Sequence, residues 1–101
     1  MNDTCHYIYV IRPCRPGLID DTTPAEEAIL EDHFAYLRSA LREGRLLLAG
    51  PCLDGQFGIV VFRAPSPEAA EEFMRHDPAV RDGLMMADLH PFRVSLLASG
   101  R

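Results

Sequence analysis

Few side chains in this sequence could carry out chemistry, and His33 is the first candidate among them. His33 lies in an amphipathic segment, just off an apolar stripe. The stripe consists of Ile29, Leu30, Phe34, Leu37 and Leu41. An unperturbed imidazole titrates near pH ~6.5, so it can accept a proton at neutral pH. A histidine beside an apolar stripe is also commonly a partly buried side chain satisfied by one hydrogen bond, and its position alone does not establish catalysis.

Other polar or backbone features could bind a substrate. Arg12 and Tyr9 belong to the first apolar run. Arg12 could bind an anionic group and Tyr9 could hydrogen-bond a phenol, although an arginine at a strand end is often only solvated. His90 stands at the entrance of the last predicted strand and could line the same cavity. Gly50 and Pro51 close another predicted strand and would allow the backbone to approach a ligand closely.

Metal and thiol chemistry are not expected. The residues that could ligate a metal lack the HxxxH or HxH spacing of a metal site. They are His33, His76, Asp77 and His90. The cysteines are odd in number and lack CxxC spacing, so we expect reduced thiols packed as small hydrophobic side chains. They are Cys5, Cys14 and Cys52. The sequence therefore predicts no metal site, and we also expect no cofactor.

The segment that carries His33 is predicted to be a helix. Thr23 is the expected N-cap, Pro24 occupies the first helical position, and Glu26 is placed to complete a capping box. Acidic residues crowd the first turns and arginines the last, which matches the helix dipole. Gly44 is expected to end the helix.

Four segments have the composition of strands, namely 6–12, 45–53, 57–63 and 89–97. Both faces of the first are apolar, which predicts an internal strand covered on both sides. The dipeptide Asp54-Gly55 predicts a hairpin between the second and third. A second helix is expected to begin at Ser66-Pro67 and to stop before Asp77-Pro78. The resulting order, βαββαβ, is that of an antiparallel, ferredoxin-like α+β fold, with residues 13–22 as a loop at the rim of a pocket.

Composition restricts the class of protein. The 101 residues fit a single domain spanning 1–101, and 48% of them are hydrophobic. The core of such a small domain is thin, which favours a homodimer. A net charge of -5 without a Lys/Arg cluster argues against nucleic-acid binding. There is no apolar run of membrane-spanning length and no basic region before the first apolar run, so we expect no membrane partner, no signal peptide and a cytoplasmic location.

Several motifs together resemble the YciI-like (YciI-related) family over nearly the whole chain. They are HFAYL at 33–37, EGRLLLAGP at 43–51, Asp54-Gly55, IVVF at 59–62, SPEAAEEFM at 66–74, DPAV at 77–80, Gly83 and HPFRVSLL at 90–97. The resemblance implies a ferredoxin-like protomer whose sheet pairs with another to form a dimeric α+β barrel. The wider superfamily includes muconolactone isomerases and antibiotic-biosynthesis monooxygenases, so the fold does not choose the reaction.

The resemblance also implies a catalytic pair, His33 and Asp77, because proteins of this type are proposed to use a His-Asp pair. One relative is similar to a dehydrochlorinase that acts on a chlorinated hydroxyhydroquinone. The implied function is a small cofactor-independent enzyme that moves a proton on a small aromatic or lactone-like substrate, in an elimination, isomerisation or dehydrochlorination. An Asp before Pro is also a common helix end or turn former.

Two other functions remain open from the sequence. One is a non-catalytic domain that binds a metabolite or serves as an accessory or regulatory module. A hydrogen-bonded His33 and Asp77 facing a cavity would favour the enzyme, and a pair pointing apart would favour the binding domain. The other is a heme-free monooxygenase like the antibiotic-biosynthesis relatives, which would need an oxidisable substrate and a different set of polar pocket residues that the sequence does not mark.

Overall fold

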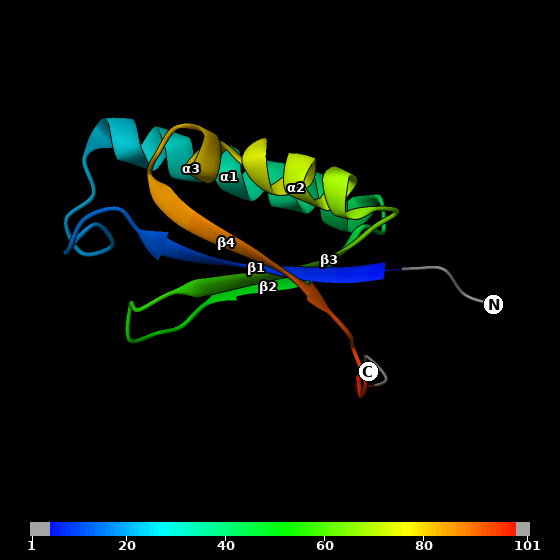
Figure 1. The fold of residues 1–101 in the computed structure, drawn as a ribbon. Coiled ribbons are helices and arrows are strands. Elements are labelled where there is room, and N and C mark those ends of the chain that lie inside the picture. The colour runs from blue at the N-terminus through cyan, green and yellow to red at the C-terminus, as the bar shows by residue number, and fades with distance from the viewer. Residues whose placement is uncertain (1–4, 99–101) are drawn as a thin grey trace.

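Three helices lie on one face of a four-stranded antiparallel sheet (Figure 1), in a computed structural model that describes residues 5–98. The elements are β1 (Cys5–Pro13), α1 (Pro24–Arg42), β2 (Leu46–Pro51), β3 (Gly58–Ala64), α2 (Pro67–Arg75), α3 (Pro78–Arg81) and β4 (Met85–Phe92). The predicted ferredoxin-like βαββαβ order is confirmed, with the short α3 added between α2 and β4. None of the helices within residues 5–98 is long and apolar enough to cross a membrane.

The sheet has the strand order β2-β3-β1-β4, so β1 is internal, as predicted. Tyr9 lies opposite Val60 of β3 on one side and Leu89 of β4 on the other. Side chains of β1 alternate between the faces of the sheet, and the helix-covered face buries Tyr7, Tyr9 and Ile11. The intervening residues of β1 are only half-buried, because no helix covers the second face (Figure 1).

The last strand begins earlier than the sequence suggested, and the predicted range 89–97 is wrong. β4 runs from Met85 to Phe92, and residues 93–98 have no regular structure. In the predicted range 89–97 Pro91 would stand at the strand entrance, but it lies near the end of β4, opposite Tyr7. A proline is tolerated there because β4 is an edge strand, with only β1 beside it.

Helix α1 begins as predicted but is rotated about its axis relative to the expected apolar stripe. Thr23 accepts a hydrogen bond from the backbone of Glu26, and the Glu26 side chain accepts one from the backbone of Thr23, which completes the capping box. The buried residues of α1 are His33, Leu37 and Ala40. Two residues of the predicted stripe are instead half-exposed, Phe34 at 49% and Leu41 at 53%. Those two face a cavity rather than the core.

The prediction that the thiols pack as small hydrophobic side chains is wrong for two of the three cysteines. Cys5 and Cys14 are exposed, and Cys52 is of intermediate burial. Cys5 begins β1 and Cys14 follows its end, so neither lies in the middle of the strand, which the helices cover. The loop after β1 does contribute to the core through Leu18, a residue only 1% exposed.

Candidate active site

His33 and Asp77, which lie 44 residues apart in the sequence, are in direct contact inside the protein. The distance from Nδ1 of His33 to Oδ1 of Asp77 is 2.6 Å. His33 is 5% exposed and Asp77 is fully buried. Helix α1 brings His33 to this point because Ala40, on the same helix face, is fully buried and lets the helix approach the sheet. The pair that the resemblance implied is therefore assembled from α1 and the α2–α3 junction.

Asp77 holds its place through three hydrogen bonds. It is the N-cap of α3, where Oδ1 accepts from the backbone N–H of Ala79 at 3.0 Å. Oδ2 accepts from the hydroxyl of Tyr9 at 2.7 Å, and the third bond is that with His33. The helix-end reading of Asp77 and the histidine-partner reading are thus both correct, because one carboxylate serves both purposes.

This arrangement determines which nitrogen of His33 is free. Oδ1 of Asp77 accepts from the N–H of Ala79, and Oδ2 accepts from the O–H of Tyr9, so neither oxygen of Asp77 acts as a donor. Nδ1 of His33 must therefore be the donor in the 2.6 Å contact, and a neutral imidazole then carries its lone pair on Nε2. Nε2 makes no hydrogen bond within residues 5–98. Every buried side-chain nitrogen in that range has a hydrogen-bond partner. Nε2 is therefore not buried and is accessible.

Tyr9 is a part of this network rather than of the cavity wall. Its side chain is fully buried, packs edge-on against Phe62 and Phe73, and directs its hydroxyl at Asp77. Burial, together with the neighbouring Asp77 carboxylate, raises the pKa of the Tyr9 phenol well above its usual value. Tyr9 is therefore a protonated donor that fixes the carboxylate, and its expected contact with a phenolic substrate stays a prediction.

An open cavity of about 740 Å³ lies between α1 and the end of the sheet formed by β2 and β3. Its lining residues are mostly apolar and include His33, Gly50 and Pro51. The helix side is formed by His33 with Leu30, Phe34, Leu37, Arg38 and Leu41. A volume of this size suits a small organic molecule. Gly50 and Pro51 thus lie beside this space, and their part in binding a substrate stays a prediction.

Local backbone features of the sheet keep the cavity open. β2 shifts register against β3 between Leu46 and Leu48, which makes Leu47 an extra residue. Beyond this bulge the small Ala49 pairs with Val60, and Pro51 with Gly58. A Cβ added to Gly58 would lie 3.3 Å from the carbonyl oxygen of Gly50, so β2 and β3 approach closely here, whereas a Cβ added to Gly50 would meet nothing within 4 Å. Small residues on the β2–β3 side of the cavity leave space that larger side chains of a packed core would fill.

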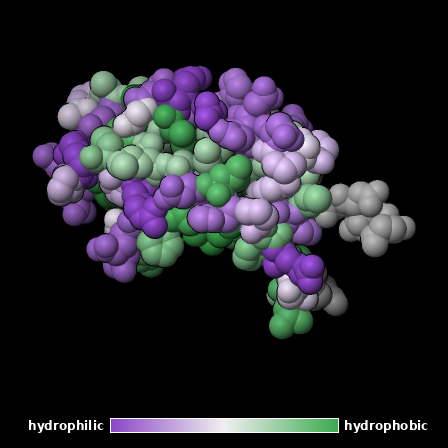
Figure 2. Space-filling view, viewed as in Figure 1, coloured by the Kyte–Doolittle hydropathy of each residue, from purple (hydrophilic) through white to green (hydrophobic). Residues whose placement is uncertain are grey.

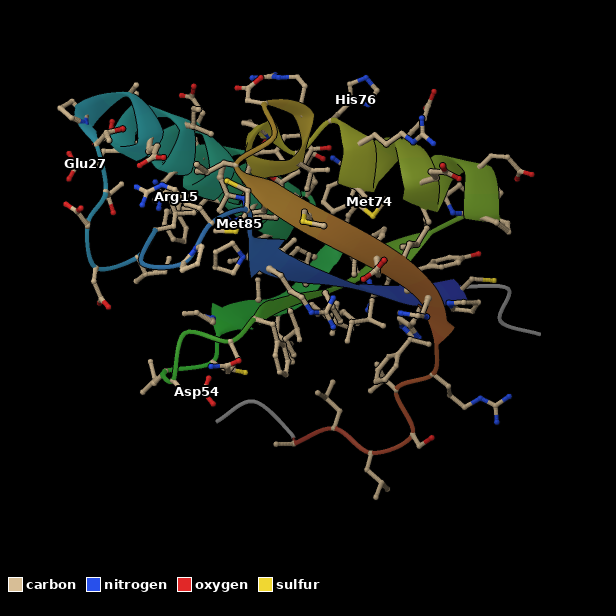
Figure 3. The ribbon with its side chains drawn as sticks, turned by 60° about the vertical axis from the view of Figure 1, so that its left-hand side comes forward. Arg15, Glu27, Asp54, Met74, His76 and Met85 are labelled. Atoms are coloured by element: carbon tan, nitrogen blue, oxygen red, sulfur yellow. The ribbon has the colours of Figure 1, made fainter. Side chains whose placement is uncertain are left out.

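The loop after β1 closes one end of the cavity through Ile19 and Thr22. Arg15 fastens this loop to α1, because its guanidinium contacts both carboxylate oxygens of Glu26, at 2.7 and 3.2 Å. The hydrogen bond from Arg15 and the bond from the backbone of Thr23 lower the pKa of Glu26 to about 2. In Figure 3, Arg15 lies beside the start of α1.

Three other candidate residues lie away from this cavity. Arg12 forms an exposed ion pair with Asp88 at 2.8 Å, on the sheet face opposite the helices. His90, opposite Ile8 in the sheet, is exposed on that same face. His76, considered above only as a metal ligand, is exposed and points away from the sheet at the outer side of the helices (Figure 3). The structure does not bring Arg12 or His90 together with His33, and their roles in binding stay predictions.

The sequence reasoning missed most of the cavity wall. Phe34 and Leu41 were read as core, and Arg38 was not singled out. The available signal was the number of positions on α1 that are suited to burial. His33 and Ala40 add to the five residues of the apolar stripe, and together they are more than one packed helix face needs. Within residues 5–98, no three His, Cys, Asp or Glu side chains are grouped so that they could hold a metal ion.

Solved structures of low sequence identity share the fold. The 5-chloro-2-hydroxyhydroquinone dehydrochlorinase TftG from Burkholderia phenoliruptrix AC1100 is 20% identical, with a TM-score of 0.64 over 86% of this chain and 93% of that one. A muconolactone isomerase is 17% identical, with a TM-score of 0.70 over 95% and 97%. SnoaB, a cofactor-independent oxygenase from Streptomyces nogalater, is 14% identical, with a TM-score of 0.51 over 97% and 99%. These likenesses support the ferredoxin-like α+β fold.

Sequence comparison leads to a family rather than to an individual relative. No curated protein matches the chain. The model of the YCII-related domain matches residues 7–92, which include all the strands and helices except the first two residues of β1. Both His33 and Asp77 lie within the matched range. The chain belongs to the YCII-related family.

Proposed function

We propose that this protein is a small cofactor-independent enzyme in which His33 acts as a general base on a small, largely apolar substrate. The observation that carries the proposal is the position of His33. Its Nδ1 is held by a buried carboxylate, and its accessible Nε2 belongs to a residue that lines an apolar cavity. A histidine that served only packing would need neither a triply hydrogen-bonded aspartate nor access to a cavity.

The chemistry proposed is the transfer of one proton. Nε2 of His33 takes a proton from an acidic C–H or O–H of the substrate, and the Asp77 carboxylate stabilises the imidazolium that forms. In an isomerisation the same proton returns to a different carbon. In an elimination the electron pair of the C–H bond forms a double bond while the leaving group departs as an anion, and the proton passes to water. The low polarity around His33 strengthens its attraction to Asp77.

The fold neighbours suggest the first compounds to test. Wild-type protein and His33→Ala should be compared on 5-chloro-2-hydroxyhydroquinone, muconolactone, and a panel of other hydroxylated or halogenated aromatics. Chloride release measures dehydrochlorination, and deuterium uptake from D₂O measured by NMR reports proton removal even where no net product accumulates. We expect turnover or exchange with the wild type and its loss in His33→Ala. Equal activity of the two proteins would remove His33 from the mechanism.

A metabolite-binding or regulatory domain is the competing function. It would use the same cavity but would need no oriented base. If the panel shows tight binding to the wild type without turnover or deuterium exchange, the binding domain replaces the enzyme. The hydrogen bond between His33 and Asp77 supports the enzyme as the first choice.

We also propose that two copies pair through the sheet face that no helix covers. Its half-buried or exposed apolar residues are Ile8, Val10, Leu48, Ile59 and Met86. Figure 2 shows apolar surface on the sheet side of the molecule, below the hydrophilic outer surface of the helices. Covering this face would add the second layer of packing that a chain of this size lacks.

A single substitution that introduces a charge tests the proposed dimer. Val10 lies on internal strand β1 in the middle of the open face. We expect Val10→Asp to convert a dimer into a folded monomer, because the new carboxylate would lie beside Asp88 of β4 and would be buried against the apolar residues of the partner's face. Multi-angle light scattering after gel filtration measures the mass, with Ala35→Asp on the exposed side of α1 as the control. A wild-type monomer, or a Val10→Asp dimer, would refute the proposal.

A further inference from the structure

Of the residues that the structure describes, one with a formally charged side chain lines the cavity, namely Arg38. Among residues 5–98, no aspartate, glutamate or lysine lines the cavity, although the protein as a whole has a net charge of -5. The other residues of the wall that can titrate are His33 and Cys52. The electrostatic character of the cavity is therefore opposite to that of the whole protein.

Arg38 is also available to a ligand. Its guanidinium makes no hydrogen bond or ion pair with any residue in the described part of the chain. Most other arginines are engaged: Arg12 with Asp88, Arg15 with Glu26, Arg45 with Glu43, Arg75 with Glu71 and Arg81 with Asp82. Arg42, one turn further along α1, likewise has no such contact within residues 5–98, but it does not line the cavity.

Arg38 follows His33 by five residues on α1, a spacing that separates the two side chains along and around the helix. Five residues of α-helix correspond to about 7.5 Å along the axis and about 140° of rotation. His33 is on the buried face of α1, whereas Arg38 is exposed, so the wall between them runs from the interior to the cavity mouth. Phe34 and Leu41, both on this wall, supply an apolar surface between the two polar groups.

We propose that Arg38 binds the anionic group of the substrate and that the substrate is an amphipathic organic acid. Its carboxylate pairs with Arg38 at the mouth, its aromatic or branched aliphatic body lies against Phe34 and Leu41, and its reacting atom reaches Nε2 of His33. The planar guanidinium can hold a carboxylate through two parallel hydrogen bonds. The reacting atom is then separated from the carboxylate by about the width of one ring or more. This inference rests on the proposed function, since it names the substrate class of the same cavity.

A matched pair of fluorescent probes tests this without knowledge of the substrate. 8-Anilinonaphthalene-1-sulfonate is an amphipathic anion whose sulfonate stands in for the carboxylate, and N-phenyl-1-naphthylamine has the same rings without the charge. Dissociation constants of both should be measured for the wild type, Arg38→Gln and Arg42→Gln. Arg38 is exposed, so Arg38→Gln should fold normally.

We expect Arg38→Gln to weaken binding of the sulfonate probe about fivefold to tenfold, as for loss of one charge-assisted contact. Binding of the neutral probe should change less than twofold, and Arg42→Gln should change neither. The inference is overturned if Arg38→Gln leaves the sulfonate probe unaffected, if it weakens both probes equally, or if Arg42→Gln has the same effect. The His33→Ala variant should keep the discrimination between probes, so this result stands or falls separately from the role of His33 in turnover.

Discussion

Replacing His33 with alanine should lower the turnover of any substrate of the wild-type protein by roughly 10²–10⁴-fold, the usual contribution of a positioned general base. The loss should appear mainly in kcat, because the apolar wall that binds the substrate is unchanged. The measurement is steady-state turnover, or deuterium exchange, on the compound that the wild type converts best.

Two variants separate the loss of a base from the loss of structure. Removing the imidazole leaves the buried Asp77 carboxylate without one of its three donors. His33→Gln offers an amide N–H to Asp77 but no base, so it should be as inactive as His33→Ala. Added imidazole should restore part of the activity of His33→Ala, because the deleted ring leaves space beside the cavity. His76→Ala changes an exposed histidine and should retain full activity. Full activity in His33→Gln would contradict the account.

Replacing Asp77 with asparagine should have the second largest effect, with a loss in turnover of roughly 10²–10⁴-fold. The amide group must place its NH₂ beside either His33 or Tyr9. Where the NH₂ meets His33, it also opposes the N–H of Ala79, Nδ1 becomes the acceptor, and the ring proton moves to Nε2, so the accessible nitrogen can no longer accept a proton. Where the NH₂ meets Tyr9, whose hydroxyl can accept, the tautomer of His33 is kept and the loss comes from the missing negative charge. The neutral amide also fails to stabilise the imidazolium.

Stability measurements accompany that prediction. Asp77→Asn should lower the free energy of unfolding by about 1–3 kcal/mol, because the hydrogen bonds of a buried group become mismatched. Urea denaturation measures this, and a variant that remains folded at the assay temperature keeps the turnover result interpretable. Asp82→Asn is the matched control, since Asp82 pairs with Arg81 on the surface. Unchanged turnover in Asp77→Asn would show that the carboxylate is only a helix cap.

Sequence motifs whose residues lie close together in the chain predicted the elements of the fold well. The Thr23-Pro24-Ala25-Glu26 start of α1 formed the expected capping box, because each of its contacts lies within four residues. The range of β4 was misjudged because Pro91 was read as a boundary, although an edge strand tolerates a proline. Whether a strand lies at an edge depends on the order of strands in the sheet, which is a tertiary property.

The site was only partly readable from the sequence. His33 and Asp77 were paired by family resemblance, and no periodicity could have joined residues on α1 and at the start of α3. The hydroxyl of Tyr9 reaches Asp77 only because β1 passes beneath both helices. The apolar stripe could not reveal that Phe34 and Leu41 face a cavity, because an apolar side chain is equally consistent with core and with a binding wall.

The proposed mechanism requires that Asp77 holds the neutral His33 ring with its proton on Nδ1 and its lone pair on Nε2. Nitrogen-15 NMR of the histidine rings distinguishes the two neutral tautomers directly and needs no substrate. When the ring is neutral, we expect the His33 signals to be those of the Nδ1-protonated form. A His33 ring protonated on Nε2 would contradict it, because the accessible nitrogen would then be unable to act as a base.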